Sequence, residues 1–329
     1  MKEPLLSLKD LEVSFFNNSG EIKVVRRVSF NLEKGEVLGV VGESGSGKSV
    51  TSMSIMKLLK GTGKITNGEI IYKGENLVNK TEKEMMKIRG NDIAMIFQDP
   101  MTSLNPVFTV GTQISDVIRR HQGLSKSDAK NKTIEMLRMV GIPSPEERYN
   151  NYPHEFSGGM RQRAIIAMAL SCEPELLIAD EPTTALDVTI QVQILKLLMD
   201  LKEKMDTSII LITHDLGVVA NTCSRVIVMY GGLIMEEGTV DDIFHNPMHP
   251  YTKGLLQSLP KKDSKGRQRL VPIKGNPPDL SKKIKGCPFA QRCPYMMNIC
   301  KEQQPKYYGE KSHKAMCWLL DKGDENHGE

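Results

Sequence analysis

The sequence predicts an α/β fold in which a parallel sheet is covered by helices on both faces. Residues 176–180 and 208–213 are apolar segments typical of buried strands, and an amphipathic helical pattern over residues 191–205 separates them. A third apolar segment, residues 36–41, leads into a glycine-rich turn and then into a helical pattern from Ser49. Strands that alternate with helices in this way indicate parallel strands buried between two helical layers.

The other expected elements follow from periodicity. Residues 6–15 and 24–32 alternate apolar and polar side chains, as edge or half-buried strands do. Further strands are expected at residues 68–72 and 93–97, and helices near 81–89, over 110–140 with a break around 121–127, and over 161–170. Beyond about Gly238 the regular alternation ends, and prolines, basic residues and cysteines become frequent. We therefore expect one large domain over residues 1–240 and an extension over residues 241–329.

Composition limits the classes of function. The chain has 329 residues, of which 39% are hydrophobic, and its net charge of +4 is too small to indicate nucleic-acid binding. Residues 261–285 hold nine basic and two acidic side chains, which predicts a solvated connector or, as the alternative, a surface near anionic lipid. The first ten residues do not resemble a signal peptide, and no segment approaches the roughly 18 apolar residues of a membrane span. A soluble cytoplasmic chain is expected, so other subunits would supply any membrane spans.

The glycine-rich turn is a full match to a phosphate-binding loop. Residues 42–49 read GESGSGKS, in which the glycines let backbone N–H groups converge on phosphates at the start of a helix. Lys48 is expected to reach the β and γ phosphates, and the Ser49 hydroxyl to bind Mg²⁺. The nucleotide-binding residues predicted here are Gly42, Ser44, Gly45, Gly47, Lys48, Ser49 and Val50.

Two carboxylates end the apolar segment at residues 176–180. Asp180 is placed to hold Mg²⁺ through water, and Glu181 to polarise the water that attacks the phosphate. Acidic strand ends are common in isolation, so this prediction depends on the phosphate-binding loop.

A second glycine-rich helix start follows Phe156. Ser157, Gly158 and Gly159 precede a helical pattern and form another potential anion site. Taken alone, these residues would be an ordinary N-capped helix. One ATP does not need two such sites from the same chain, so we expect this one to cap the γ-phosphate bound by a partner chain.

With these residues in order, the chain resembles the ATP-hydrolysing subunits of ABC transporters over residues 1 to about 240. The resemblance implies a P-loop NTPase core with an antiparallel β subdomain and a helical subdomain near residues 100–170. It assigns Walker A to residues 42–49, Walker B to residues 176–181 and the signature to residues 156–162. It further identifies Gln98 as the Q-loop glutamine that senses Mg²⁺, Asp187 as part of the D-loop and His214 as the switch histidine. Phe15, or alternatively Phe16, resembles the aromatic residue that stacks on adenine.

Three further segments resemble the ATP-binding subunits of oligopeptide, dipeptide and nickel importers. They are FQDPMTSLNP at residues 97–106, NPMHPYTKGLL at residues 246–256 and GNPPDL at residues 275–280. Departures are small: Phe156 stands where many signatures have Leu, and Thr184 where many D-loops have Ser.

Four cysteines of the extension have a spacing that suits a metal centre. Cys287, Cys293, Cys300 and Cys317 are separated by 5, 6 and 16 residues, without the close CxxC pairs of zinc ribbons. Four thiolates can hold Zn²⁺ or an iron–sulfur cluster, and the spacing leaves both open with iron–sulfur ahead. The resemblance favours a [4Fe-4S] cluster with a structural role. His313 lies between the last two cysteines and is not expected to be a ligand.

The resemblance implies an ATPase at the cytoplasmic face of the cell membrane that powers peptide import. Its partners would be membrane permease subunits, a second ATP-binding subunit that completes a nucleotide sandwich and, indirectly, an extracytoplasmic substrate-binding protein. Nickel import is one alternative. A soluble ABC ATPase acting on ribosomes or DNA and an iron–sulfur redox protein that binds nucleotide are two others.

Overall fold

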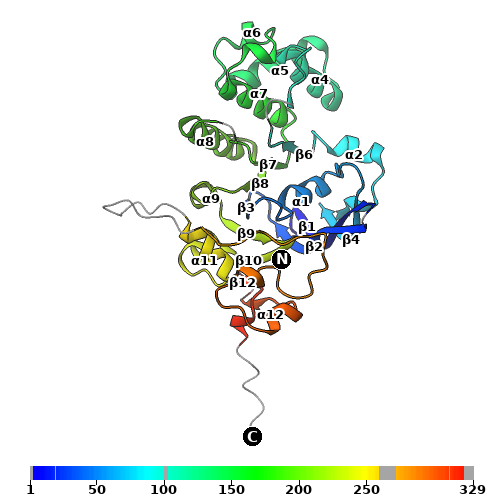
Figure 1. Ribbon diagram of the computed structural model, residues 1–329. Helices are drawn as coiled ribbons and strands as arrows, with labels where there is room; N and C mark the ends of the chain where they lie inside the picture. The colour runs from blue at the N-terminus through cyan, green and yellow to red at the C-terminus, as the bar shows by residue number, and fades with distance from the viewer. Residues whose placement is uncertain are drawn as a thin grey trace, which may run out of the picture. The chain divides into compact units, whose positions relative to one another are not determined.

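A computed structural model describes residues 3–18, 20–99, 103–184, 186–258, 272–310 and 312–321. These residues form two compact units (Figure 1). The first unit comprises residues 1–5, 32–37 and 73–212, and the second comprises residues 6–31, 38–72 and 213–329, each with the gaps given above.

Three parallel strands form the sheet of the first unit. Strands β8 (Ser208–Thr213), β7 (Leu176–Asp180) and β6 (Ile93–Ile96) lie in this order, and Leu176 pairs with both Ser208 and Ile93. Every residue of β7 and β8 is buried, as expected for parallel strands that are covered on both faces. The strands predicted at residues 176–180 and 208–213 are therefore confirmed.

Helices make up most of the rest of the first unit. They are α2 (Glu82–Ile88), α4 (Val110–Gln122), α5 (Lys126–Met139), α6 (Pro145–Arg148), α7 (Gly158–Leu170) and α8 (Val188–Met205). Helices α4, α5, α6 and α7 gather in one lobe, drawn in green at the top of Figure 1. A buried hydrogen bond of 2.9 Å between the Ser115 and Thr133 hydroxyls joins α4 to α5. The predicted break between two helices is confirmed, because Gly123 ends α4 in a left-handed conformation and Ser125 caps α5.

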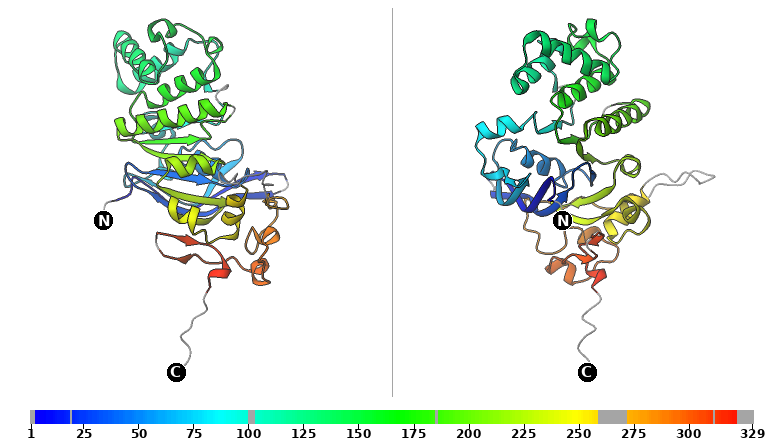
Figure 2. Two further views of the ribbon diagram at one scale, coloured as in Figure 1. Left: turned by 90° about the vertical axis from the view of Figure 1, so that its left-hand side faces the viewer. Right: turned by 180° about the vertical axis from the view of Figure 1, so that it is seen from behind.

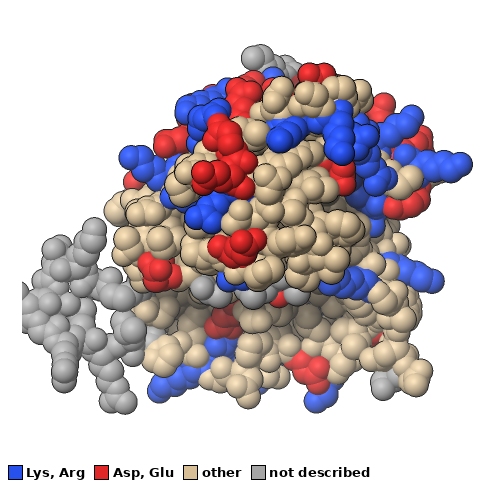
Figure 3. Space-filling view, turned by 90° about the horizontal axis from the view of Figure 1, so that it is seen from above, with Lys and Arg blue, Asp and Glu red and all other residues tan. Residues whose placement is uncertain are grey.

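The surface of this helical lobe carries charges of both signs. Basic and acidic side chains are interspersed over the face seen from above, with uncharged areas between them (Figure 3). Within the lobe, Arg119 forms an ion pair with Asp116 and Arg138 with Glu146. The lobe therefore presents a mixed surface on this face.

Among the described residues, no helix is both long enough and apolar enough to cross a membrane.

The second unit contains an antiparallel sheet built from the first half of the chain. Strands β2 (Gly20–Leu32), β1 (Leu6–Asn17) and β4 (Gly63–Tyr72) lie in this order, and β1 pairs antiparallel with β4 from Leu6↔Tyr72 to Phe15↔Gly63. The apolar residues Leu6, Leu8, Leu11 and Val13 of β1 are all buried. The strict alternation expected from the sequence is interrupted by a register shift between Lys9 and Glu12, and Ser7 and Ser14 are buried as well.

A second sheet in this unit joins the Walker A strand to the end of the chain. Strand β3 (Val37–Val41) is parallel to β9 (Arg225–Tyr230), which is antiparallel to β10 (Leu233–Thr239). Strands β12 (Lys314–Ala315) and β11 (Tyr308–Gly309), at the red end of the ribbon in Figure 2, extend this sheet beyond β10. The extension thus shares a sheet with the strand that carries the Walker A loop.

Short helices complete the second unit. They are α1 (Lys48–Ile55), α9 (Leu216–Thr222), α10 (Val240–His245), α11 (Pro250–Gln257) and α12 (Ile299–Glu302). The short elements that remain among the described residues are β5 (Glu75–Asn76) and the 3-10 turns at Leu77–Asn79, Pro153–Glu155, Ala290–Arg292 and Trp318–Leu320.

One apolar core ties the extension to the rest of the second unit. Val41 of β3 and Val226 and Val228 of β9 share this core with Phe289 and Met316 of the extension. Tyr251, a residue of α11, is fully buried in it. Because protein cores are packed as densely as organic crystals, a movement of the extension would displace side chains that contact β3, the strand that leads into the Walker A loop.

The structure also corrects some element bounds. Strand β4 begins at Gly63 rather than near residue 68, because its polar first half pairs with β1. Helix α8 begins at Val188 rather than at residue 191, because Asp187 caps it. Strands β9 and β10 were not among the expected elements. Of the basic segment at residues 261–285, residues 261–271 lie outside the described residues.

Candidate functional site

The Walker A loop of the second unit depends on glycines in conformations that other residues avoid. Gly42 has a φ of 152°, and a Cβ atom added to it would lie 2.1 Å from the Met229 carbonyl oxygen. Gly47 has a φ of 103° and forms the N-cap of α1. Ser44 and Gly45 at the tip of the loop are exposed. The loop therefore presents its backbone at a helix start, an arrangement that favours phosphate binding.

Lys48 lies within the curl of this loop. Its side chain is buried, and its Nζ donates to the carbonyl oxygens of Gly42 and Glu43 at 2.7 and 3.0 Å and contacts the Ser46 hydroxyl at 3.3 Å. Ser49 follows in the first turn of α1 and is half-buried. The loop thus holds a positive charge next to the backbone that would surround a phosphate.

In the first unit, Gln98 and Glu181 meet. Gln98 follows β6 and Glu181 follows the neighbouring strand β7. Gln98 Nε2 donates to Glu181 Oε2 at 3.0 Å, and the Thr184 hydroxyl donates to the same oxygen at 2.9 Å. Glu181 has a φ of 47°, and its backbone N–H donates to the Ile212 carbonyl at 2.9 Å. Its carboxylate is therefore oriented by two donors while its backbone is fixed to β8.

This contact is absent from the sequence predictions. The signal for it was that Gln98 and Glu181 both follow apolar strands, since parallel neighbours bring their carboxyl ends to one edge of a sheet. Asp180, the last residue of β7, is almost fully buried beside Glu181 in the chain.

The signature segment also begins a helix, as predicted. Ser157 caps α7 by accepting from the Met160 N–H at 3.3 Å, and its side chain is exposed. A Cβ atom on Gly159 would lie 3.1 Å from Ile190 in the first turn of α8. Asp187 caps α8 by accepting from the Ile190 N–H at 3.0 Å. The N-termini of α7 and α8 therefore lie next to each other, and Gly158 and Gly159 are both partly exposed at the first of them.

The two aromatic residues proposed for adenine differ in their surroundings. Phe15 is half-buried, and its ring lies over Gly63 of the paired strand, where an added Cβ would approach within 2.8 Å. Phe16 is 39% exposed, and Lys64 Nζ lies 5.9 Å from its ring centroid. His214 follows β8 and is exposed.

The four cysteines of the extension line one small cavity. Cys287, Cys293, Cys300 and Cys317 surround it together with apolar side chains that include Phe289 and Trp318. All four are free thiols. Burial, with a further contribution from the other three cysteines, raises the pKa of Cys287 to about 12. Burial also raises the pKa of Cys293 and of Cys317.

Two observations bear on whether these four cysteines can bind a metal. Within the described part of the chain, no three His, Cys, Asp or Glu side chains are close enough together to hold one metal ion. That finding supports neither a zinc ion nor an iron–sulfur cluster at these cysteines. Four thiols around one cavity are still the donor set that an iron–sulfur cluster uses. His313 does not line this cavity, and its Nε2 lies 2.9 Å from Glu236 Oε1.

Comparisons with known proteins identify the family. Residues 25–184 match the family described as "ABC transporter", and residues 235–300 match "Oligopeptide/dipeptide transporter, C-terminal region". The oligopeptide transport ATP-binding protein OppD of Bacillus subtilis (strain 168) is 57% identical over 318 residues, which cover 96% of this chain and 89% of that protein. The chain belongs to the oligopeptide and dipeptide ABC transporter ATP-binding family. The dipeptide transport ATP-binding protein DppD of the same organism is 55% identical over 326 residues, or 98% of this chain and 97% of DppD.

Solved structures show the ABC ATPase fold. The ATP-binding cassette MJ0796, in a dimeric post-hydrolysis state bound to ADP and Pi, matches with a TM-score of 0.64 and 29% identity. The match covers 71% of this chain and 98% of that cassette. The similarity extends to cbiO1 of Clostridium perfringens, part of the ABC transporter complex cbiONQ, with a TM-score of 0.64 and 27% identity over 74% of this chain and 92% of that one. The fold expected from the motif order is therefore confirmed.

Proposed function

We propose that this ABC ATPase hydrolyses ATP to power the import of oligopeptides or dipeptides across a membrane. The observation that carries the proposal is a Walker A loop with Lys48 held inside it, in a chain that is 57% identical to OppD over 96% of its length. In this proposal, residues 1–240 act as the nucleotide-binding domain and residues 241–329 as an extension.

The Walker A residues would bind the nucleotide. Backbone N–H groups of residues 42–50 and the Lys48 ammonium would hold the phosphates, while Phe15 would stack on adenine. Ser49, Asp180 and Gln98 offer oxygen donors, which suit Mg²⁺. Bound Mg²⁺ would neutralise charge on the β and γ phosphates.

Other residues would carry out hydrolysis and couple it to a second subunit. Glu181, oriented by Gln98 and Thr184, would accept a proton from the attacking water. His214 would contact the γ-phosphate. Ser157–Gly159 would cap the γ-phosphate bound by a second ATP-binding subunit, and Asp187 would lie near that subunit.

We further propose that the chain binds permease subunits at the cytoplasmic face of the membrane, with an extracytoplasmic binding protein delivering the peptide. Exposed apolar side chains in the segment of the chain that contains Gln98 support a protein contact there: Phe97, Val107 and Phe108 are 40%, 73% and 52% exposed. Large exposed apolar surface commonly marks a protein interface.

The proposal is tested on the purified transporter in membrane vesicles. ATP hydrolysis should rise when a peptide-loaded binding protein is added, and it should be lost when Lys48 is replaced by Ala. A complex whose ATPase rate does not respond to peptide, or a Lys48→Ala variant with wild-type hydrolysis, would contradict the proposal.

For the extension, we propose that Cys287, Cys293, Cys300 and Cys317 hold a [4Fe-4S] cluster with a structural role. Burial raises the pKa of these thiols because a thiolate without a partner is unfavourable in such surroundings. A bound metal would replace the protons and stabilise the thiolates. When bound, the cluster would supply a covalent tie between the four segments that carry these cysteines.

Iron, acid-labile sulfide and zinc are measured in protein purified without oxygen. The proposal expects iron and sulfide in equal amounts near four per chain, and their loss in Cys300→Ser. Stoichiometric zinc without iron would favour the alternative, and protein with neither metal would overturn a metal centre.

A further inference from the structure

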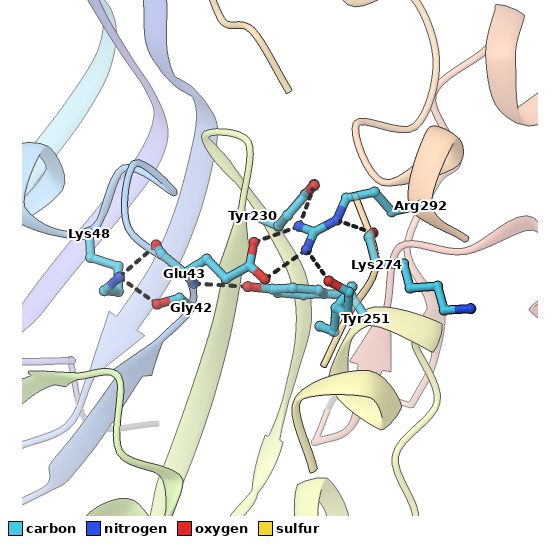
Figure 4. Close-up of polar contacts among 8 residues, drawn as sticks. Gly42, Glu43, Lys48, Tyr230, Tyr251, Lys274 and Arg292 are labelled. Carbon is cyan, nitrogen blue, oxygen red and sulfur yellow. Dashed lines mark hydrogen bonds and ion pairs between the residues drawn. The ribbon is translucent and has the colours of Figure 1, made fainter. Parts of the chain in front are cut away.

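The extension reaches the Walker A loop through an ion pair between Arg292 and Glu43. Arg292 Nη1 lies 2.6 Å from Glu43 Oε2, and Nη2 lies 3.0 Å from Glu43 Oε1 (Figure 4). The side chains of Arg292 and Glu43 are 6% and 27% exposed. This is a two-point contact between a planar guanidinium and a carboxylate, which fixes orientation as well as distance.

The guanidinium of Arg292 is fixed from every side. Its Nε donates to the Lys274 carbonyl at 3.0 Å, Nη1 donates to the Tyr230 hydroxyl at 3.0 Å, and Nη2 donates to the Ile273 carbonyl at 3.1 Å. With the two bonds to Glu43, all five N–H donors of the side chain are used. Arg292 is therefore a rigid support for Glu43 rather than a mobile surface residue.

A second bond holds the backbone of the same loop residue. The Glu43 N–H donates to the Tyr251 hydroxyl at 2.9 Å. Tyr251 is fully buried, and its ring packs against Tyr230 and Phe289 with centroid separations of 4.5 and 5.3 Å. Arg292 thus holds the side chain of Glu43, and Tyr251 holds its backbone. Both residues come after β9 in the chain.

On its other side, Glu43 touches the lysine that is proposed to bind phosphate. The Glu43 carbonyl accepts from Lys48 Nζ at 3.0 Å, next to the Gly42 carbonyl. Figure 4 shows the resulting line of contacts from Arg292 and Tyr251 through Glu43 to Lys48. Arg292 is therefore linked to the Lys48 ammonium through a single intermediate residue, Glu43.

We propose that Arg292 is a positioning residue for the Walker A loop, through which the cysteine-bearing extension sets the affinity of the ATPase for nucleotide. The inference rests on the proposed function, because it concerns the same ATP site. Arg292 immediately precedes Cys293 and ends the 3-10 turn Ala290–Arg292 between Cys287 and Cys293. Whatever holds those two cysteines in place also holds Arg292.

The test compares Arg292→Met with a matched control in full-length protein. Arg225→Met is that control, because it removes another ion pair of the second unit, the one between Arg225 and Glu237 of β10. Arg225 begins β9, whereas Tyr230, the residue of β9 that contacts Arg292, ends it. The readouts are the Kd for a fluorescent ATP analogue, KM and kcat for ATP hydrolysis, the melting temperature and the metal content. Arg292→Met is expected to raise Kd and KM by about 3- to 30-fold, the range typical of coupling between sites, with kcat at saturating ATP much less affected. Arg225→Met should lower the melting temperature without changing Kd.

Glu43→Gln provides a second route should Arg292→Met fail to fold. It should raise Kd to a similar extent, and the double variant should be no worse than either single one, because both remove the same contact. Arg292→Lys keeps the charge but loses the fork and should recover only part of the affinity.

Two results would overturn the inference: an unchanged Kd in Arg292→Met and Glu43→Gln, or a Kd that changes equally in Arg225→Met. An unmodified protein that does not bind or hydrolyse ATP would instead refute the proposed function. Unchanged metal content in Arg292→Met shows that the effect comes from the ion pair and not from loss of the cysteine site.

Discussion

Replacement of Glu181 by Gln separates the chemistry of this residue from its structural role. Glu181 Oε2 accepts from both Gln98 and Thr184, and glutamine offers a carbonyl oxygen in the same place with nearly the same shape. The hydrogen bonds that orient the side chain can therefore survive, whereas the basic carboxylate is lost. A positioned general base contributes about 100- to 10,000-fold, so hydrolysis should slow by that factor, or about 3–5 kcal/mol in activation free energy.

The assay measures single-turnover phosphate release together with ATP affinity and melting temperature. Glu181→Gln should bind ATP as the unmodified protein does and should accumulate as an ATP-bound dimer. Thr184→Val is the matched control, because it removes one donor to Glu181 and keeps the carboxylate, so it should slow hydrolysis far less. Hydrolysis by Glu181→Gln at an unmodified rate would refute the role of Glu181 as base. A large fall in its melting temperature would refute the claim that glutamine preserves the local structure.

Three further predictions concern the second unit. Burial, together with nearby Lys253, lowers the pKa of His249 to about 3, so below the unfolded value near 6.5 the unfolded chain binds a proton that the folded chain does not. The contribution of His249 to the free energy of unfolding should thus be fully present above pH 6.5 and should fall toward pH 3 by up to about 1.4 kcal/mol per pH unit. Denaturant unfolding at several pH values measures this fall. The variant His249→Asn, which keeps a cap for α11, should show a smaller change of the unfolding free energy with pH. Gly42→Ala should abolish ATP binding, since its Cβ would lie 2.1 Å from a backbone oxygen. Gly45→Ala should weaken binding less, because its added Cβ meets no atom within 4 Å and the variant suffers only the backbone strain of a φ of 77°; equal affinities in a nucleotide titration would contradict this. Phe289→Ala should lower the free energy of unfolding by about 3–5 kcal/mol, because the ring is buried in the core shared with β3 and β9; a loss below 1 kcal/mol in denaturant unfolding would show that the extension is not packed into that core.

The elements that could be predicted from the sequence are those whose own residues determine them. The apolar segments ending at Asp180 and Thr213 are buried strands because both faces need apolar side chains. The Walker A loop follows from glycines and a lysine at fixed spacing within eight residues. The polar first half of β4, by contrast, is a strand only because β1 pairs with it, and no local pattern indicates that pairing.

The contacts around the site were harder to predict for the same reason. Glu43 and Arg292 are 249 positions apart, and each belongs to a segment with a separate motif. NPMHPYTKGLL could be recognised from the family, but its role in holding Glu43 depends on Tyr251 being buried next to the loop. Sequence patterns thus identified the chemical groups, and tertiary packing determines which of them support each other.

The most direct test of the account is peptide uptake by the complete transporter in sealed vesicles, with ATP supplied only on the side of the ATP-binding subunits. The account predicts that a labelled peptide accumulates together with ATP hydrolysis and that both are lost in Glu181→Gln. Uptake that continues without hydrolysis, or sustained hydrolysis without any peptide movement, would contradict it.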